Sequence, residues 1–176
     1  MNHRFPTKDL ILIALLAAVG LAVKPVVKTV THFISTPLGI PGGTLSGGFY
    51  MMWLTLAMAL TKRFGAATLT GLLQGFVVLI TGLFGGHGAI SLLTFSLPGV
   101  AADFIGYFYK RYEKLDGQIL YCILANLTGT WIVGLIIMRL PKAPLYIALG
   151  ISIISGALGG VLAWLIYREL KKYKVV

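Results

Sequence analysis

The sequence predicts an all-α integral membrane protein, with six transmembrane helices forming a single domain over residues 1–176. Hydrophobic residues make up 57% of the chain and charged residues only 11%, and the mean hydropathy is +0.89, outside the range of soluble globular domains. Apolar runs follow one another along the chain, most of them close to the roughly 20 residues that cross a hydrocarbon core about 30 Å thick. The segments between them are short, so no room remains for a soluble domain.

The expected helices are the apolar runs that lie between polar breaks. In order, they are Leu10–Val30, Ser46–Thr61, Gly65–Leu83, Ala89–Phe108, Gln118–Met138 and Pro144–Tyr167. Lys24, Pro25 and Lys28 interrupt the first run, a pattern that also fits a signal peptide, but the five spans that follow favour a retained helix. Basic residues or turns rich in Gly and Pro separate the later runs.

The charge distribution sets the expected orientation. The chain has 15 Lys and Arg against five Asp and Glu, a net charge of +10. When the termini and alternate loops are assigned to one side, that side carries Arg4, Lys8, Lys62, Arg63, Lys110, Arg111, Lys114, Arg168, Lys171, Lys172 and Lys174. The other side carries only Lys24, Lys28, Arg139 and Lys142. Because basic residues concentrate on the cytoplasmic side of membrane proteins, we expect both termini in the cytoplasm.

The segment Thr31–Leu45, between the first two helices, then lies on the outer side. It reads THFISTPLGIPGGTL, which is rich in Pro and Gly for a helix and apolar for a freely solvated loop. Non-helical backbone near a membrane persists where it is buried in protein or lines a cavity, so we expect this segment to cap the bundle. The alternative is a plain connector.

Several helices carry small residues at four-residue spacing, which places them along one stripe. These are Ala14, Ala18 and Ala22 in the first helix, Gly71 and Gly75 in the third, and Ser152, Gly156 and Gly160 in the sixth. Such stripes let helices approach closely in lipid. For the third and sixth helices we expect packing within this chain, whereas the alanine face of the first helix could equally meet another protein.

Six polar or aromatic residues are candidates for binding a small ligand. Gln74 and Asn126 fall near mid-membrane, and Tyr50, Trp53, His87 and Trp131 lie on their outer side. Amides that donate and accept hydrogen bonds, with aromatic rings around them, suit a planar and partly polar molecule. The alternatives are interhelical hydrogen bonds for the amides, an aromatic belt at the interface for the rings, and a solvated loop position for His87.

An enzyme is disfavoured, and we expect no cofactor and no metal. The sequence has no GxxxxGK[ST] loop to hold a nucleotide phosphate, no HExxH motif and no paired carboxylates spaced for hydrolysis. Cys122 lies in an apolar run without a CxxC partner and reads as a small buried residue. Asp103 is the one acidic residue at membrane depth, where it could pair with a basic neighbour, cap a helix end or relay protons.

Two runs of residues, together with the alanine stripe, carry a resemblance to a known family. They are Gly42-Gly43-Thr44-Leu45-Ser46-Gly47-Gly48-Phe49-Tyr50-Met51-Met52-Trp53 and Arg63-Phe64-Gly65-Ala66-Ala67-Thr68-Leu69-Thr70-Gly71-Leu72-Leu73-Gln74-Gly75. With its size and six-helix plan, the chain resembles the substrate-binding S component of an energy-coupling factor (ECF) transporter, within that family most nearly the thiamine or hydroxymethylpyrimidine group.

The resemblance implies high-affinity binding of a vitamin or vitamin precursor on the outer side of a prokaryotic plasma membrane, below the loop between the first two helices. It also implies association with a transmembrane coupling protein and two cytoplasmic ATPases, with Ala14, Ala18 and Ala22 facing the coupling protein. Two other readings remain open. One is a structural membrane protein without a ligand, and the other is an autonomous proton-coupled carrier that uses Asp103.

Overall fold

The computed structural model describes residues 5–35, 42–82 and 88–173. In these residues the chain is helical, without strands, and its six helices confirm the predicted fold class. They are α1 Thr7–Ser35, α2 Gly42–Thr61, α3 Ala66–Thr81, α4 Ile90–Tyr109, α5 Leu115–Ile132 and α6 Lys142–Lys172, with a π-helical segment, η1 Val133–Ile137, continuing α5. Within the described ranges, α1, α2, α4, α6 and α5 with its continuation are long and apolar enough to cross a membrane. The remaining helix, α3, is apolar but has only 16 residues.

The first two helices are longer than the sequence predicted. The expected non-helical segment Thr31–Leu45 was too wide, since α1 runs on to Ser35 and α2 already begins at Gly42. Within α1, the Thr31 hydroxyl donates to the Val27 carbonyl, 2.9 Å away. The first turn of α2 contains Gly42 and Gly43, which the sequence had placed in the loop. Residues 36–41 lie outside the described residues, so the capping role of this segment stays a prediction.

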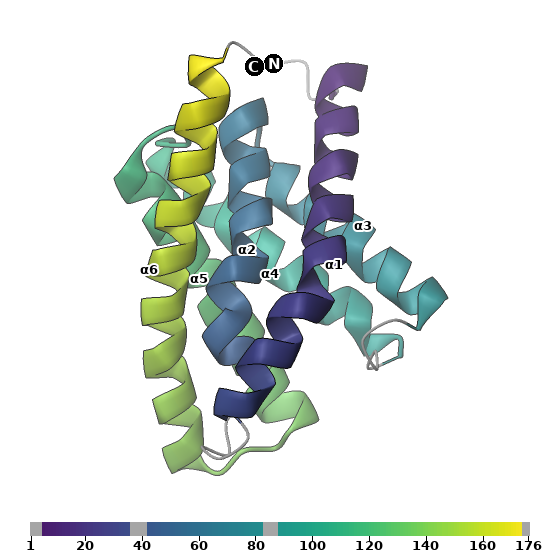
Figure 1. Ribbon diagram of the computed structural model, residues 1–176, viewed down its shortest axis with the longest axis vertical. Coiled ribbons are helices and arrows are strands. Elements are labelled where there is room, and N and C mark those ends of the chain that lie inside the picture. Colours follow the sequence, from purple (N-terminus) through teal and green to yellow (C-terminus); the bar gives the residue numbers. More distant parts are fainter. Residues whose placement is uncertain (1–4, 36–41, 83–87, 174–176) are drawn as a thin grey trace.

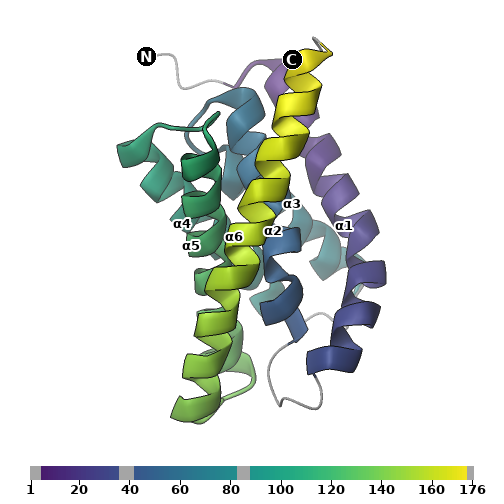
Figure 2. The same ribbon diagram turned by 60° about the vertical axis from the view of Figure 1, so that its left-hand side comes forward.

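The helices form one bundle in which α1 begins and α6 ends at the same end, at the top of Figure 1. We call this the terminal end and the opposite one the far end. The helix α2 lies between α1 and α6, and α3 and α4 run obliquely behind them (Figures 1 and 2). The helix α1 changes direction along its length, and Pro25 lies inside it, where it removes a backbone hydrogen bond.

Small residues bring the helices close together, as predicted for the third and sixth helices. A Cβ atom added at Gly160 would lie 2.5 Å from the Ile119 Cα of α5, and one added at Gly156 would lie 2.7 Å from the Ile123 Cα. In α3, a Cβ at Gly71 would overlap the Phe95 carbonyl oxygen of α4. These distances leave no room for a side chain, so glycine is required for the close contacts of α6 with α5 and of α3 with α4.

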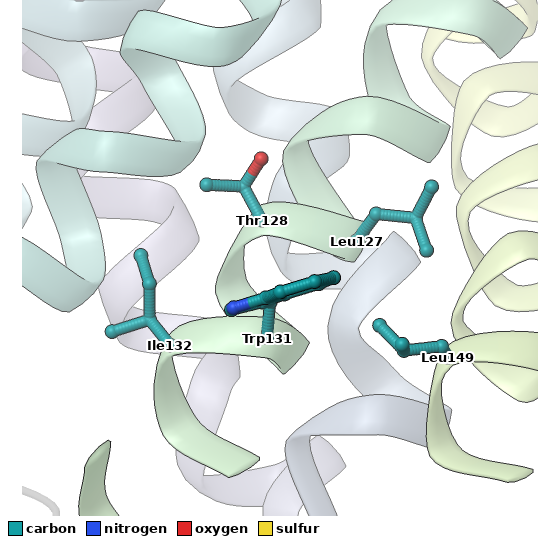
Figure 3. A pocket seen from close by; sticks show the side chains of 5 residues that line it. All are labelled: Leu127, Thr128, Trp131, Ile132 and Leu149. Carbon is teal, nitrogen blue, oxygen red and sulfur yellow. The ribbon is translucent and has the colours of Figure 1, made fainter. Parts of the chain in front are cut away.

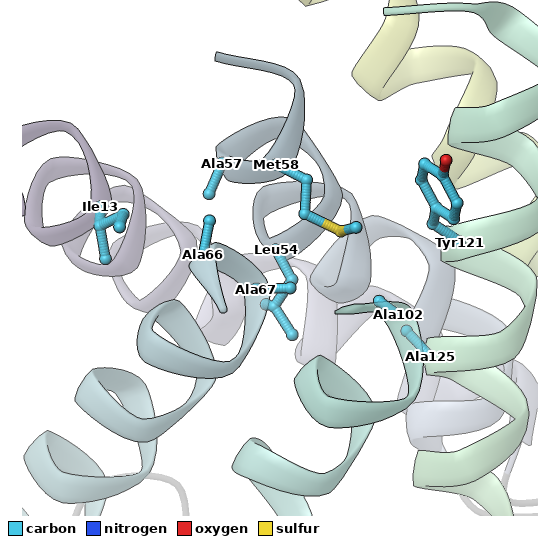
Figure 4. Packing of buried hydrophobic residues seen from close by; sticks show 9 residues of the cluster. All are labelled: Ile13, Leu54, Ala57, Met58, Ala66, Ala67, Ala102, Tyr121 and Ala125. Carbon is cyan, nitrogen blue, oxygen red and sulfur yellow. The ribbon is translucent and has the colours of Figure 1, made fainter. Parts of the chain in front are cut away.

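The centre of the bundle is filled largely by alanines (Figure 4). The cluster consists of Ile13, Leu54, Ala57, Met58, Ala66, Ala67, Ala102, Tyr121 and Ala125, contributed by α1 to α5. Figure 4 shows Ala57 of α2 and Ala66 of α3 pointing toward one another. Small side chains at these positions let five helices meet around one core.

Ion pairs join the loops and helix ends at the terminal end. Glu113, which precedes α5, forms ion pairs with Lys62, which follows α2, and with Lys171 of α6, whose Nζ lies 3.0 Å from Glu113 Oε2. These two hydrogen-bonded lysines lower the pKa of Glu113 to about 2. Arg63 pairs with Asp9 of α1 at 2.6 Å. The terminal end therefore uses its few carboxylates to hold neighbouring elements together.

Asp103 of α4 caps the N-terminus of α3. Its carboxylate accepts hydrogen bonds from the Thr68 backbone N–H at 2.8 Å, from the Thr68 hydroxyl at 2.6 Å and from the Ala67 N–H at 3.4 Å. Gly65, at the N-cap position of α3, has φ 91° and offers no side chain, so the acceptor comes from a neighbouring helix. Of the roles considered for Asp103, capping a helix end is the one that the structure shows.

We expect Asp103→Asn to destabilise the protein by about 1–3 kcal/mol, because an amide has one acceptor oxygen and no charge to offer α3. Thermal unfolding of the purified protein in detergent measures this. The control is Asp116→Asn. The Asp116 carboxylate pairs with Arg111 on the surface and is 44% exposed, so its replacement should lower the unfolding temperature much less. Equal effects of the two substitutions would contradict the capping role.

Candidate ligand-binding site

Three of the predicted binding residues lie together where α1, α2 and α3 meet. Tyr50 and Trp53 come from α2 and Gln74 from α3, and α1 approaches them at Gly20. A Cβ atom added at Gly20 would lie 2.5 Å from Gln74 Nε2 and 3.1 Å from Trp53 Cδ1, so the amide and the indole flank one point on α1. Gln74 Nε2 donates to the Ala17 carbonyl of α1 in a long contact of 3.5 Å.

The indole N–H of Trp53 gives this group unused hydrogen-bonding capacity. Trp53 Nε1 is buried and has no hydrogen-bond partner among the residues that the structure describes. A buried indole donor ordinarily finds an acceptor, so an acceptor from a bound molecule would satisfy it. Next to Trp53, Phe49 packs edge-to-face at a ring distance of 6.3 Å and fixes the orientation of the indole.

Two further residues, Lys24 of α1 and Phe95 of α4, join this group and were not among the predicted binding residues. Lys24 Nζ lies 3.6 Å from the centre of the Phe95 ring and 4.9 Å from the centre of the Tyr50 ring. The Tyr50 hydroxyl donates to the Lys24 carbonyl at 3.4 Å. The signal in the sequence was the lysine itself, since a cation within an apolar span is rare. We call Lys24, Tyr50, Trp53, Gln74 and Phe95 the α1–α4 cluster.

Asn126 lies elsewhere, in the contact of α5 with α2 and α6. Its side chain is buried, and Nδ2 donates to the Ser152 carbonyl of α6 at 2.9 Å. A Cβ atom at Gly47 of α2 would overlap its Oδ1. Both ends of the amide are therefore used in helix packing, which is the interhelical role that the sequence left open.

Trp131 also lies apart from the α1–α4 cluster, on the outward face of α5. It is 55% exposed and lines an open pocket of about 310 Å³ with Leu127, Thr128, Ile132 and Leu149 (Figure 3). The Thr128 hydroxyl already donates to the Leu124 carbonyl, so little besides the indole N–H could orient a ligand here. The π-helical segment η1 begins directly after this pocket.

The alanine face of α1 is open in this chain. Ala14, Ala18 and Ala22 are all exposed, while Ile13 and Ala17 of the same helix are buried. The face is thus not used in packing within the described residues, and its contact with a partner stays a prediction. His87, another predicted binding residue, lies outside the described residues.

In the described ranges, no three His, Cys, Asp or Glu side chains come close enough to hold a metal ion. Cys122 is buried as expected, and its thiol donates to the Gly48 carbonyl at 3.5 Å. The α1–α4 cluster offers different chemistry, namely aromatic faces, an amide, an indole donor and an ammonium group. These groups suit an organic molecule.

The bundle has a counterpart among solved structures. Its fold is that of a solved protein described as an S-component of an ECF transporter, with a TM-score of 0.79 and 18% sequence identity over 98% of this chain and 88% of that chain. The expected S-component resemblance is therefore confirmed at the level of the fold.

The amino-acid sequence also matches a protein family. Residues 8–132 match the model of the permease component of ABC-type cobalt transport systems. This match covers more than half of the chain, and the protein belongs to that family. The comparison with curated proteins gives no match. The family places the chain among multi-pass membrane components of transporters, in line with the expectation that it is not an enzyme.

Proposed function

We propose that this chain is the substrate-binding subunit of an ECF-type importer in a prokaryotic plasma membrane. It captures a small heterocyclic vitamin or vitamin precursor from the outer side, with thiamine or its hydroxymethylpyrimidine precursor as the first candidates. A transmembrane coupling protein and two cytoplasmic ATPases supply the energy, since the chain has no nucleotide-binding loop of the GxxxxGK[ST] type.

The α1–α4 cluster is the observation that carries this proposal. Tyr50, Trp53 and Phe95 supply aromatic faces for a planar ring, and Gln74 and the indole N–H of Trp53 supply directional hydrogen bonds. The three aromatic side chains are half-buried, so they are neither sealed in a core nor turned fully outward. A heterocycle needs this combination of stacking surface and a few polar groups.

A matched pair of tryptophan substitutions tests where the ligand binds. Hydroxymethylpyrimidine and thiamine are titrated into the purified protein and the heat of binding is measured. We expect saturable binding of one molecule per chain, weakened more than tenfold by Trp53→Leu because stacking area and an indole donor are lost. Trp131→Leu should leave the affinity within about twofold, since this side chain lies on the outward face of α5.

The other outcomes are equally informative. Loss of binding in Trp131→Leu alone would move the site to the pocket between α5 and α6. No binding of any heterocycle by the unsubstituted protein would favour a structural membrane protein without a ligand. Uptake that depends on Asp103 without partner subunits would favour an autonomous carrier, although the bonds of this carboxylate to α3 speak for a structural role.

A further inference from the structure

A cation in the second half of α1, toward the far end, calls for a chemical explanation. Lys24 is half-buried, and its Nζ lies over the Phe95 ring of α4 and beside the Tyr50 ring of α2. A lysine within a membrane span is costly and commonly turns its ammonium group toward the interface or toward a functional cavity. Here the ammonium group lies inside the bundle, against the same aromatic side chains that form the α1–α4 cluster.

The charges around Lys24 are positive throughout the far half of the bundle. The five carboxylates of the whole sequence are Asp9, Asp103, Glu113, Asp116 and Glu169. They belong to the start of α1, the end of α4, the loop after it, the start of α5 and the end of α6, and thus to the terminal half. The far half contains Lys24, Lys28, Arg139 and Lys142 without a compensating acid. A divalent cation arriving there would meet repulsion and no carboxylate ligand.

We infer that Lys24 is a ligand-binding residue that donates hydrogen bonds from its ammonium group to an acceptor on an organic ligand. The acceptor is a ring nitrogen or an anionic substituent of a heterocycle whose flat face contacts Tyr50 and Phe95. This inference rests on the proposed function and narrows its substrate class to uncharged or anionic heterocycles, which favours hydroxymethylpyrimidine over the cationic thiamine. The α1–α4 cluster itself offers no carboxylate, imidazole or thiolate ligand for the metal ion that the family description names.

The geometry supports this role. An ammonium group carries three donors on a flexible four-carbon stem, and it can turn from an aromatic face toward an acceptor without moving a helix. The Phe95 and Tyr50 rings hold it meanwhile at 3.6 and 4.9 Å from their centres, which stabilises a cation in the absence of a carboxylate. The buried N–H of Trp53 has no acceptor among the described residues, so a ligand with hydrogen-bond acceptors would also satisfy this donor of the α1–α4 cluster.

The test compares three variants of the full-length purified protein in lipid nanodiscs. Lys24→Met removes the charge and keeps an apolar stem, Lys24→Arg keeps the charge, and Lys28→Met removes an exposed cation one turn further along α1. The probes are hydroxymethylpyrimidine, its monophosphate and cobalt chloride. We expect Lys24→Met to weaken the binding of hydroxymethylpyrimidine at least tenfold, and the binding of its monophosphate by a larger factor. Lys24→Arg should retain part of the affinity for both organic probes. Lys28→Met should keep both affinities within twofold of the unsubstituted protein.

Folding is checked separately, because Lys24→Met takes a charge out of the membrane span and should not lower the unfolding temperature. Unchanged affinity of a folded Lys24→Met for both organic probes would overturn the inference and leave the proposed function standing. Saturable binding of cobalt that Lys24→Met strengthens would place the metal beside Lys24 and would overturn the inference as well. If the unsubstituted protein bound neither organic probe, the proposed function itself would fall, and the inference with it.

Discussion

Replacing Gly159 by alanine should destabilise the protein by about 3 kcal/mol or more, a large effect for a single methyl group. The added Cβ would overlap the Gly48 carbonyl oxygen of α2. Gly48 cannot easily yield, because its N–H donates to Ser155 Oγ at 3.0 Å and its carbonyl accepts from the Cys122 thiol. The substitution therefore forces α2 and α6 apart at a contact where backbone meets backbone.

Gly150→Ala is the matched control on the same helix. Among the described residues, no atom outside the neighbouring backbone of α6 lies within 4 Å of the Cβ that it would add, and the position is exposed. We expect unchanged stability or a gain of up to about 1 kcal/mol, since alanine is the better helix former. Thermal unfolding of both variants in one detergent decides the matter, and equal midpoints for the two would show that α2 and α6 are not packed as described.

Ala18→Trp should abolish ligand uptake by cells and leave ligand binding by the purified protein unchanged. Ala14, Ala18 and Ala22 form an exposed face on α1 that packs against no described part of this chain. Small residues permit close approach of a partner helix, and an indole in the middle of the face would hold the two proteins apart. The partner that we propose is the transmembrane coupling protein, without which bound ligand is not carried inward.

Leu158→Trp controls for the general effect of a large side chain on a membrane surface. Leu158 is 63% exposed on α6, away from the alanine face, and its replacement should leave uptake close to normal. Uptake is compared at equal amounts of the two variants in the membrane, measured by immunoblot. Normal uptake by Ala18→Trp would show that this face of α1 is not the docking surface.

The helices could be predicted from the sequence because a membrane span must satisfy its own backbone and be apolar over a fixed length. The end of α1 could not. The Pro and Gly residues after Ser35 suggested a wide loop that begins at Thr31, yet α1 stays helical as far as Ser35. The short length of α3 also escaped prediction, because its apolar pattern runs past Thr81 into Gly82, which has a φ of 63° and ends the helix.

The candidate site could be predicted only in part, because depth in the membrane does not fix the direction of a side chain. Asn126 and Trp131 lie at neighbouring depths on α5, but five residues rotate them by about 140° around the helix axis. Asn126 therefore points at α6, whereas Trp131 points outward. Trp53 and Gln74 meet because α1 approaches both α2 and α3 at Gly20, and Tyr50 reaches α1 through its hydrogen bond to the Lys24 carbonyl. No local pattern reveals these contacts between distant segments.

Native mass spectrometry of the protein purified from cells grown in rich medium tests the central claim most directly, because a tightly held ligand dissociates slowly enough to survive purification in detergent. A binding subunit should retain a heterocyclic vitamin or precursor at close to one molecule per chain, and the mass identifies it. A protein that emerges empty and shows no change in tryptophan fluorescence with a panel of vitamins would contradict the account.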